Sequence, residues 1–134
     1  MTTSTAWSML RALPVMVLSA CVVAAAGAGA GGGIYLTQRG VESVVPVPVD
    51  RAASATTRAF DELKIHQTKS STEQDADGEK REVDGTSGDR DVTVTIKAEQ
   101  TSSSRIQVVA KKSAVTWDKD FARTILNKIV AYSR

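Results

Sequence analysis

The clearest pattern in the chain is a strict alternation of apolar and polar residues in DVTVTIK, residues 91–97. Successive side chains of a strand point to opposite faces, so this alternation predicts a strand with one buried and one solvated face. The segment RIQVVAKK, residues 105–112, repeats the alternation after the polar loop EQTSSS. We therefore expect these two strands to pair as an antiparallel hairpin.

Three further segments are predicted to be extended. Residues 34–49, IYLTQRGVESVVPVPV, are rich in β-branched side chains. Pro46 and Pro48 favour an edge strand or a strand end, because proline has no amide hydrogen to donate. The polar residues 65–80 and the segment REVDGTS, residues 81–87, each end in a turn that contains glycine, and each predicts a strand.

Two segments have helical periodicity. Asp50 is a residue suited to cap a helix, and alanines recur on one face of residues 51–64. Residues 118–132 carry an apolar stripe that includes Ile125. The resulting order, β-α-β-β-β-β-α, predicts an α+β domain in which a small antiparallel sheet of four to five strands carries both helices on one face.

The segment before this domain has the layout of an export signal. Residues 1–11 carry one arginine and no acid, and ALPVMVLSA, residues 12–20, is uncharged and mostly apolar. A short basic region followed by roughly 7–15 apolar residues and then small residues is typical of a signal peptide. The sequence that follows, AAAGAGAGGG at residues 24–33, leaves four interpretations of the whole stretch.

Three of these interpretations are weaker. A transmembrane helix is disfavoured because the strongly apolar side chains end at Val23, and glycine-rich sequence forms helix poorly. Gly27, Gly29 and Gly32 match the spacing of a dinucleotide-binding loop, with Asp50 beyond them, but that loop needs a preceding strand and a following helix. Cleavage at one of several small-x-small sites would release a soluble secreted domain.

The fourth interpretation, lipidation, rests on four consecutive residues. Leu18, Ser19, Ala20 and Cys21 resemble the lipobox of bacterial lipoproteins, and they lie at the end of the apolar region. The resemblance implies cleavage before Cys21 and attachment of a diacylglycerol to its thiol, which anchors the chain in a membrane. Cys21 is the single cysteine of the chain, so the remainder can form neither a disulfide nor a cysteine metal site.

The domain organisation follows from this assignment. Residues 1–20 are expected to be a lipoprotein signal peptide, residues 21–33 a Gly/Ala-rich tether, and residues 34–134 a single α+β domain. A tether of this composition spans roughly 20 Å on average. Some lipoproteins carry an inner-membrane retention aspartate after the acylated cysteine, and this chain carries Val22 there. The resemblance therefore implies an outer-membrane lipoprotein that faces the periplasm.

The layout of the whole domain also resembles a known family. A glycine-rich tether, a first strand near Tyr35, a V-x-V-x-I strand and a terminal amphipathic helix are similar to a family of small bacterial lipoproteins of unknown function. The resemblance covers about residues 34–130. It implies a fold and a location and carries no activity with it.

No arrangement of residues supports catalysis or a metal site. Nucleophilic catalysis usually needs a histidine beside the nucleophile, and the only histidine, His66, lies at the start of a predicted strand. An EF-hand-like spacing lacks the final glutamate and the flanking helices, so an acidic hairpin loop is favoured over a calcium site. The residues with that spacing are Glu73, Asp75, Asp77, Gly78 and Asp84.

Charge and composition restrict the classes of partner that we expect for this protein. The net charge is only +2, with basic and acidic residues interleaved, and Arg105, Lys111 and Lys112 lack interleaved aromatics, so we expect no nucleic-acid partner. We expect a lipid-anchored module of the cell envelope that is not an enzyme, has no cofactor or metal, contacts the membrane through acylated Cys21 and binds an unknown envelope protein.

Two alternatives stay open. One is a membrane-anchored module that binds a small ligand between the sheet and the helices. The other is a secreted soluble domain, if Cys21 carries no lipid. A filled core with an open strand edge at residues 41–47 would favour a protein partner, whereas an apolar concavity along the alanine-rich helix would favour a small ligand.

The lipobox makes a prediction about the exported protein. We expect its intact mass to correspond to a chain that begins at Cys21 and carries diacylglycerol, because the lipobox directs cleavage before the acylated cysteine. Cys21→Ala removes the thiol and should yield protein without lipid. An unlipidated wild-type chain cut near residues 26–30, or an uncut chain, would contradict the assignment.

Overall fold

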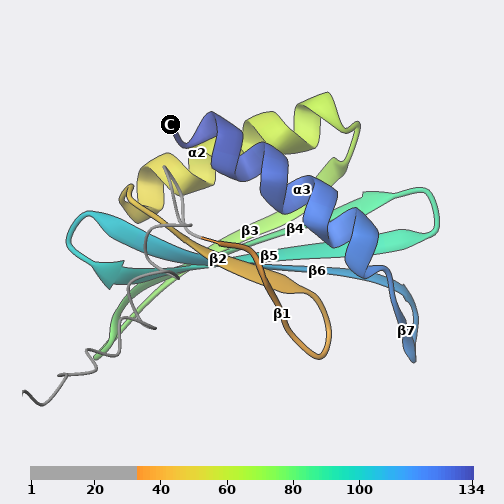
Figure 1. Ribbon diagram of the computed structural model, residues 1–134, viewed down its shortest axis with the longest axis horizontal. Helices are drawn as coiled ribbons and strands as arrows, with labels where there is room; N and C mark the ends of the chain where they lie inside the picture. The colour runs from red at the N-terminus through yellow and green to blue at the C-terminus, as the bar shows by residue number, and fades with distance from the viewer. Residues whose placement is uncertain (1–32) are drawn as a thin grey trace, which may run out of the picture.

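The computed structural model describes residues 33–134, which form one antiparallel sheet of seven strands with two helices on one of its faces (Figure 1). The helices are α2 (Val49–Glu62) and α3 (Lys119–Tyr132). The strands are β1 (Tyr35–Leu36), β2 (Val41–Val45), β3 (His66–Asp75), β4 (Gly78–Ser87), β5 (Arg90–Gln100), β6 (Ser103–Ser113) and β7 (Thr116–Trp117).

The strands follow the order β1-β2-β6-β5-β4-β3, and β7 pairs with the end of β6. Strands β3 to β6 are consecutive hairpins, whereas β2 lies on the far side of β6. All neighbours are antiparallel, so β2 and β3 run in the same direction although three strands separate them. The chain passes from one to the other through α2, which crosses over the sheet.

The α+β class, the antiparallel sheet and the two helices of the sequence prediction are confirmed, but the expected four to five strands are too few. The additional strands, β1 and β7, have two residues each. A two-residue strand has no periodic pattern to detect. The predicted first strand is also divided, because the chain turns at residues 37–40, where the Thr37 amide donates to the Gly40 carbonyl at 2.9 Å.

The two helices differ in how their N-termini are capped. Asp118, expected as the first residue of the helix, is instead the cap of α3, and its side chain accepts a hydrogen bond from the Phe121 amide at 2.9 Å. The expected cap of α2 is wrong, because Pro48 occupies that position without a side-chain bond. Asp50 lies in the first turn instead, where its carboxylate binds Arg81 of β4 at 2.8 Å.

The core fills the layer between the sheet and the helices. Helix α2 packs mainly on β4 and β5, α3 packs on β6 and β2, and the two helices contact each other. Burying each large apolar side chain stabilises the fold by roughly 1.5–3 kcal/mol. The largest apolar side chains with less than 2 % exposure are Phe60, Ile96, Ile106, Ile125, Leu126, Ile129, Val41, Val45, Val92, Val94 and Val108.

Small residues allow α2 to lie close to the sheet and to α3. Ala52, Ala55 and Ala59 are at most 2 % exposed along one face of α2. Beneath the end of this helix, a Cβ added to Gly85 of β4 would lie 2.9 Å from the Phe60 ring and 2.8 Å from Ile65 Cγ2. The absence of a side chain at Gly85 therefore makes room for the ring of Phe60.

Helix α3 is fixed to the start of β5 by one arginine. Arg90 Nε lies 2.7 Å from Asp118 Oδ2, and its guanidinium lies over the Phe121 ring, 4.9 Å from the centroid. The Phe121 amide and then Arg90 hold the pKa of Asp118 below its usual value. Between residues 33 and 134 neither helix has the length and hydropathy needed to cross a bilayer.

Gly40 is required by space rather than by backbone conformation. A Cβ at this position would lie 2.0 Å from the Val108 carbonyl oxygen of β6. We expect Gly40→Ala to lower the free energy of unfolding by about 1–3 kcal/mol, because the backbones of β2 and β6 must move apart. Denaturant unfolding measures this change.

Gly33→Ala is the matched control, since a Cβ there would meet nothing nearer than Tyr35 Cζ at 3.8 Å. An equal loss of stability in both variants would contradict the role given to Gly40.

Candidate functional site

The residues that the sequence favours most lie outside the described part of the chain. The lipobox Leu18, Ser19, Ala20 and Cys21 precedes residue 33, as do the signal peptide and nearly all of the tether. The glycines of the dinucleotide-loop spacing lie there too. The described residues therefore show the surface that the domain offers to a partner and not any attachment to a membrane.

The structure does not bring the acidic residues of the EF-hand-like spacing together. Asp75 closes the β3–β4 turn by accepting the Asp77 amide at 2.9 Å, and Glu73 faces Lys80 at 3.6 Å. Asp84 lies further along β4 and accepts the Thr93 hydroxyl at 2.7 Å. Within residues 33–134 no group of three or more His, Cys, Asp or Glu side chains could hold a metal ion.

Strand β3 is the long open edge of the sheet. It pairs with β4 on one side, and no described strand pairs with it on the other (Figure 1). Its sequence HQTKSSTEQD is polar throughout, and every residue but Ser71 is exposed. His66 is the first of these exposed residues, opposite Thr86 of β4. An edge of this kind presents backbone N–H and C=O groups that a further strand can bind.

The opposite edge is less accessible than the sequence suggested. The segment considered there, residues 41–47, contains β2, which pairs fully with β6 and, through Val41 and Glu42, with β1. Pro46 and Pro48 follow directly. The principal open edge of the described sheet is therefore β3, which lies on the other side of the molecule.

On the sheet face that carries no helices, charged side chains form ion pairs with one another. Arg105 of β6 binds Glu99 at 2.8 Å and Glu42 of β2 at 3.0 Å. The hydrogen bond with Glu99 is the main reason that the pKa of Arg105 lies above its usual value, and the same contact lowers the pKa of Glu99. These residues satisfy one another, so this part of the face offers few free groups to a ligand.

A second group of interactions ties the two helices together at their outer surface. Glu62, the last residue of α2, accepts hydrogen bonds from Lys128, at 2.7 Å, and from the Tyr132 hydroxyl, both on α3. The contact with Lys128 and then that with Tyr132 lower the pKa of Glu62. The same carboxylate raises the pKa of Tyr132, because it stabilises the protonated phenol and repels the phenolate.

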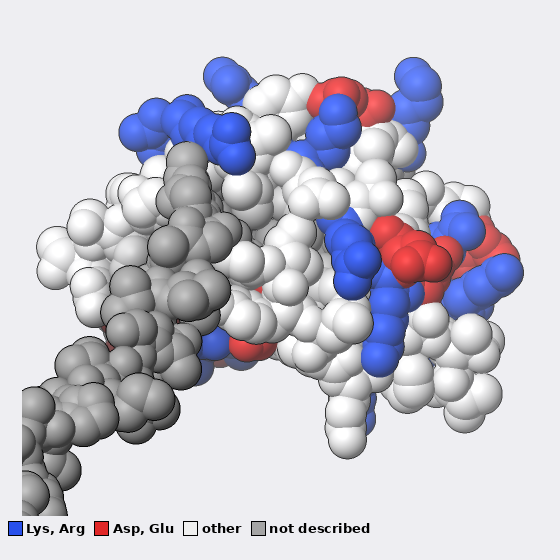
Figure 2. Space-filling view, in the orientation of Figure 1, with Lys and Arg blue, Asp and Glu red and all other residues white. Residues whose placement is uncertain are grey.

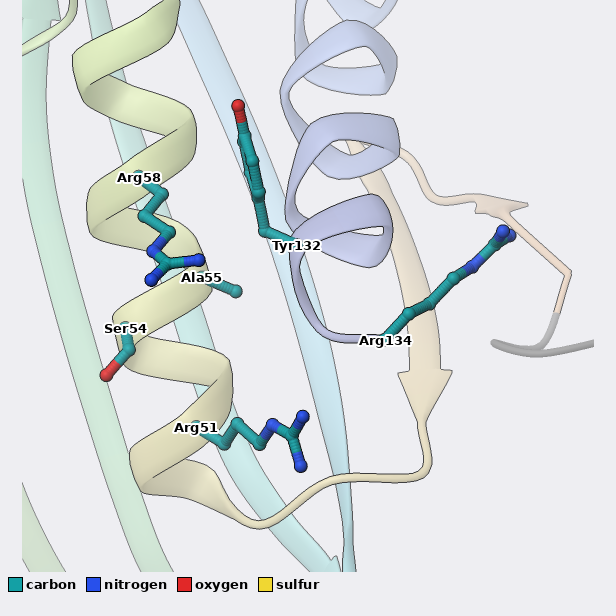
Figure 3. A pocket seen from close by; sticks show the side chains of 6 residues that line it. All are labelled: Arg51, Ser54, Ala55, Arg58, Tyr132 and Arg134. Atoms are coloured by element: carbon teal, nitrogen blue, oxygen red, sulfur yellow. The ribbon is translucent and has the colours of Figure 1, made fainter.

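A small pocket lies beside this contact, between α2 and the end of α3 (Figure 3). Its volume is about 220 Å³. The alanine-rich face of α2 is buried in the core and does not form the apolar concavity expected for a small-ligand site. The lining is basic and polar instead, and comprises Arg51, Ser54, Ala55, Arg58, Tyr132 and Arg134.

The geometry defines a class of protein: an α+β domain with one helix-covered sheet face, one polar face and one long open edge. Residues 4–131 match the family described as "Protein of unknown function (DUF3568)", and the chain belongs to this family. No curated protein matches the chain.

Sequence reasoning missed both the edge at β3 and the arginine pocket. The polar composition of residues 65–80 was a signal for exposure, but it does not reveal which strand lacks a neighbour. Arg51 and Arg58 lie seven residues apart on one helix, and this spacing was a signal for a shared face. The proximity of the end of α3 depends on the fold.

The link between Glu62 and Tyr132 predicts a change in titration. In Glu62→Gln the uncharged amide no longer repels the phenolate, so we expect the pKa of Tyr132 to fall. The ultraviolet absorbance of phenolate, followed against pH, measures the change, and Tyr132→Phe assigns the transition. Asp61→Asn removes a neighbouring acid that forms no ion pair with the described residues and should leave the curve unchanged. An unaltered curve in Glu62→Gln would contradict the link.

Proposed function

We propose that this protein is a non-enzymatic interaction module of the cell envelope, anchored by lipid at Cys21, that binds an extended segment of an envelope protein along β3. The observation that carries the proposal is the single-sided pairing of β3 over ten residues. Neither a cofactor nor a metal takes part in this function.

The length of the edge supports strand addition. Ten residues of strand extend over about 33 Å, enough for several main-chain hydrogen bonds to a partner strand. The bulge between Gln67 and Lys69 disturbs one end, and Lys69 discourages pairing with a like-charged edge. The remaining stretch, residues 70–75, is regular and is the part of the edge best suited to a partner.

The side chains of β3 indicate the chemistry of the partner. They are exposed and polar, with hydroxyl, amide and charged groups and no large apolar residue. A partner strand would therefore gain affinity chiefly from backbone hydrogen bonds, and its specificity from polar contacts with these side chains.

The lipobox supports the anchor and the location. A diacylglycerol on Cys21, joined to the domain by a tether of roughly 20 Å, would hold β3 near a membrane surface, where a partner in the same envelope layer meets it at high effective concentration. Val22 after the cysteine favours the outer membrane, on the side of the periplasm.

Site-specific photo-crosslinking in cells tests the strand site. A photoreactive residue at Thr72 or Gln74 of β3 should give a covalent adduct with an envelope protein, because the partner strand would lie within reach of these side chains. The same residue at Asn127, exposed on α3, is the control and should give none. Adducts from Asn127 alone, or none from β3, would contradict the proposal.

The same crosslinks test the anchor. We expect Cys21→Ala to abolish the adducts from β3, because the unlipidated chain is no longer held beside its partner. Adducts of unchanged yield would contradict the anchored location and leave the strand site standing.

A further inference from the structure

The pocket between α2 and α3 concentrates positive charge without a compensating acidic side chain. Three of its six lining residues are arginines, Arg51, Arg58 and Arg134, and none has an acidic side chain. In the space-filling view, basic side chains gather at this end of the helix layer (Figure 2). No ion pair or hydrogen bond joins these three guanidinium groups to another described residue.

The acids near these arginines in the sequence do not pair with them: Asp61 forms no ion pair with a described residue, and two others are engaged elsewhere. Asp50 binds Arg81 of β4 at 2.8 Å, although it directly precedes Arg51. Glu62, four residues beyond Arg58, is held by Lys128 and Tyr132. Arg81, Arg90 and Arg105 each have a carboxylate partner, whereas the pocket arginines, like Arg39 and Arg123, have none among the described residues. The positive charge of the pocket is therefore available to a ligand.

The geometry directs two of the arginines to one place. Arg51 and Arg58 lie seven residues apart, which is about two turns or 10 Å along α2, and so project from the same face. The Arg51 side chain extends toward the gap between the helices, and the Arg58 side chain runs along the front of α2 toward Ala55, so that its guanidinium lies on the Arg51 side of its own backbone (Figure 3). Arg134 lines the α3 side, and its guanidinium is directed away from α2.

The other polar groups of the pocket already donate hydrogen bonds within the protein, so a ligand would be bound by these arginines. The Ser54 hydroxyl donates to the Asp50 carbonyl at 3.1 Å, and the Tyr132 hydroxyl donates to Glu62. The Tyr132 ring forms a wall, close enough to Arg58 that the positive charge acts on its phenol. A ligand here must accept hydrogen bonds from guanidinium groups rather than donate them.

We propose that this pocket binds the phosphate group of an anionic ligand through Arg51 and Arg58. A phosphate offers several acceptor oxygens in the geometry that guanidinium groups bind bidentately, and its charge complements the two unpaired guanidinium groups of α2. Neither a free phosphate nor the phosphodiester of a lipid headgroup needs the pocket to change shape, because the site is open to solvent.

The test is a titration of the full chain in non-ionic detergent by isothermal calorimetry. Three soluble probes are compared: inorganic phosphate, glycerophosphoglycerol (the headgroup of an anionic phospholipid without its acyl chains) and acetate. We expect saturable binding of at least one phosphate probe, and about tenfold weaker binding in Arg51→Gln and in Arg58→Gln, since a hydrogen-bonded charge is lost in each.

Arg123→Gln is the matched control. Arg123 is an exposed arginine of α3 outside the pocket, so its loss changes the net charge equally and should leave the affinity unchanged. Both pocket residues are exposed and unpaired among the described side chains, so the variants should unfold at the wild-type temperature. Thermal unfolding of each variant verifies this point.

The outcomes separate the sources of the phosphate. Binding of inorganic phosphate that depends on Arg51 and Arg58 supports the site and indicates a phosphomonoester or free phosphate. Binding of glycerophosphoglycerol alone, with the same dependence, supports it and indicates a lipid headgroup. Equal weakening by Arg123→Gln, binding of acetate as tight as phosphate, or no saturable binding of either phosphate probe would overturn the proposal.

Discussion

The structure depends on the passage of α2 over the sheet from β2 to β3. The two strands run in the same direction but lie three strands apart, so the connecting helix must cross the apolar face and contact it closely. Alanines along α2 and the missing side chain at Gly85 allow this contact, and Phe60 fills the space that remains. Because the crossover covers only part of the face, α3 is needed to bury the apolar residues of β2 and β6. At the outer surface, Glu62 of α2 also contacts Lys128 and Tyr132 of α3.

The same crossover creates both surfaces to which function is assigned. The crossover connects β2 to β3 at the far edge of the sheet, where β3 pairs with a strand on one side only. It also turns the polar face of α2 outward beside the end of α3, so that Arg51 and Arg58 border a pocket without acidic side chains. The two surfaces belong to different layers, one to the sheet edge and one to the helices. The two proposed ligands, a partner strand on β3 and an anion between the helices, would therefore not compete for the same surface.

Three parts of the surface differ in whether carboxylates balance the charge of their arginines. On the uncovered sheet face, Arg105 is balanced by Glu42 and Glu99. At the junction of sheet and helix, Arg90 is balanced by Asp118. At the end of the helix layer the arginines lack such partners among the described residues. Exposed ion pairs contribute little to stability, so this difference says more about binding than about folding.

The sequence by itself determined the local structure. Alternation in residues 91–97 and 105–112 predicts strands because side chains of a strand alternate between two faces, and the apolar stripe of residues 118–132 predicts α3 because residues three and four apart share one face of a helix. The resemblance of residues 18–21 to a lipobox is likewise a prediction from the sequence alone, because it needs no tertiary structure. Only the tertiary structure decided which strands are neighbours, that β3 rather than the segment at 41–47 is the open edge, and that the end of α3 meets the arginines of α2. The physical reason is that periodicity specifies which face of an element is buried, whereas strand order and helix contact arise from pairing between residues far apart in the chain.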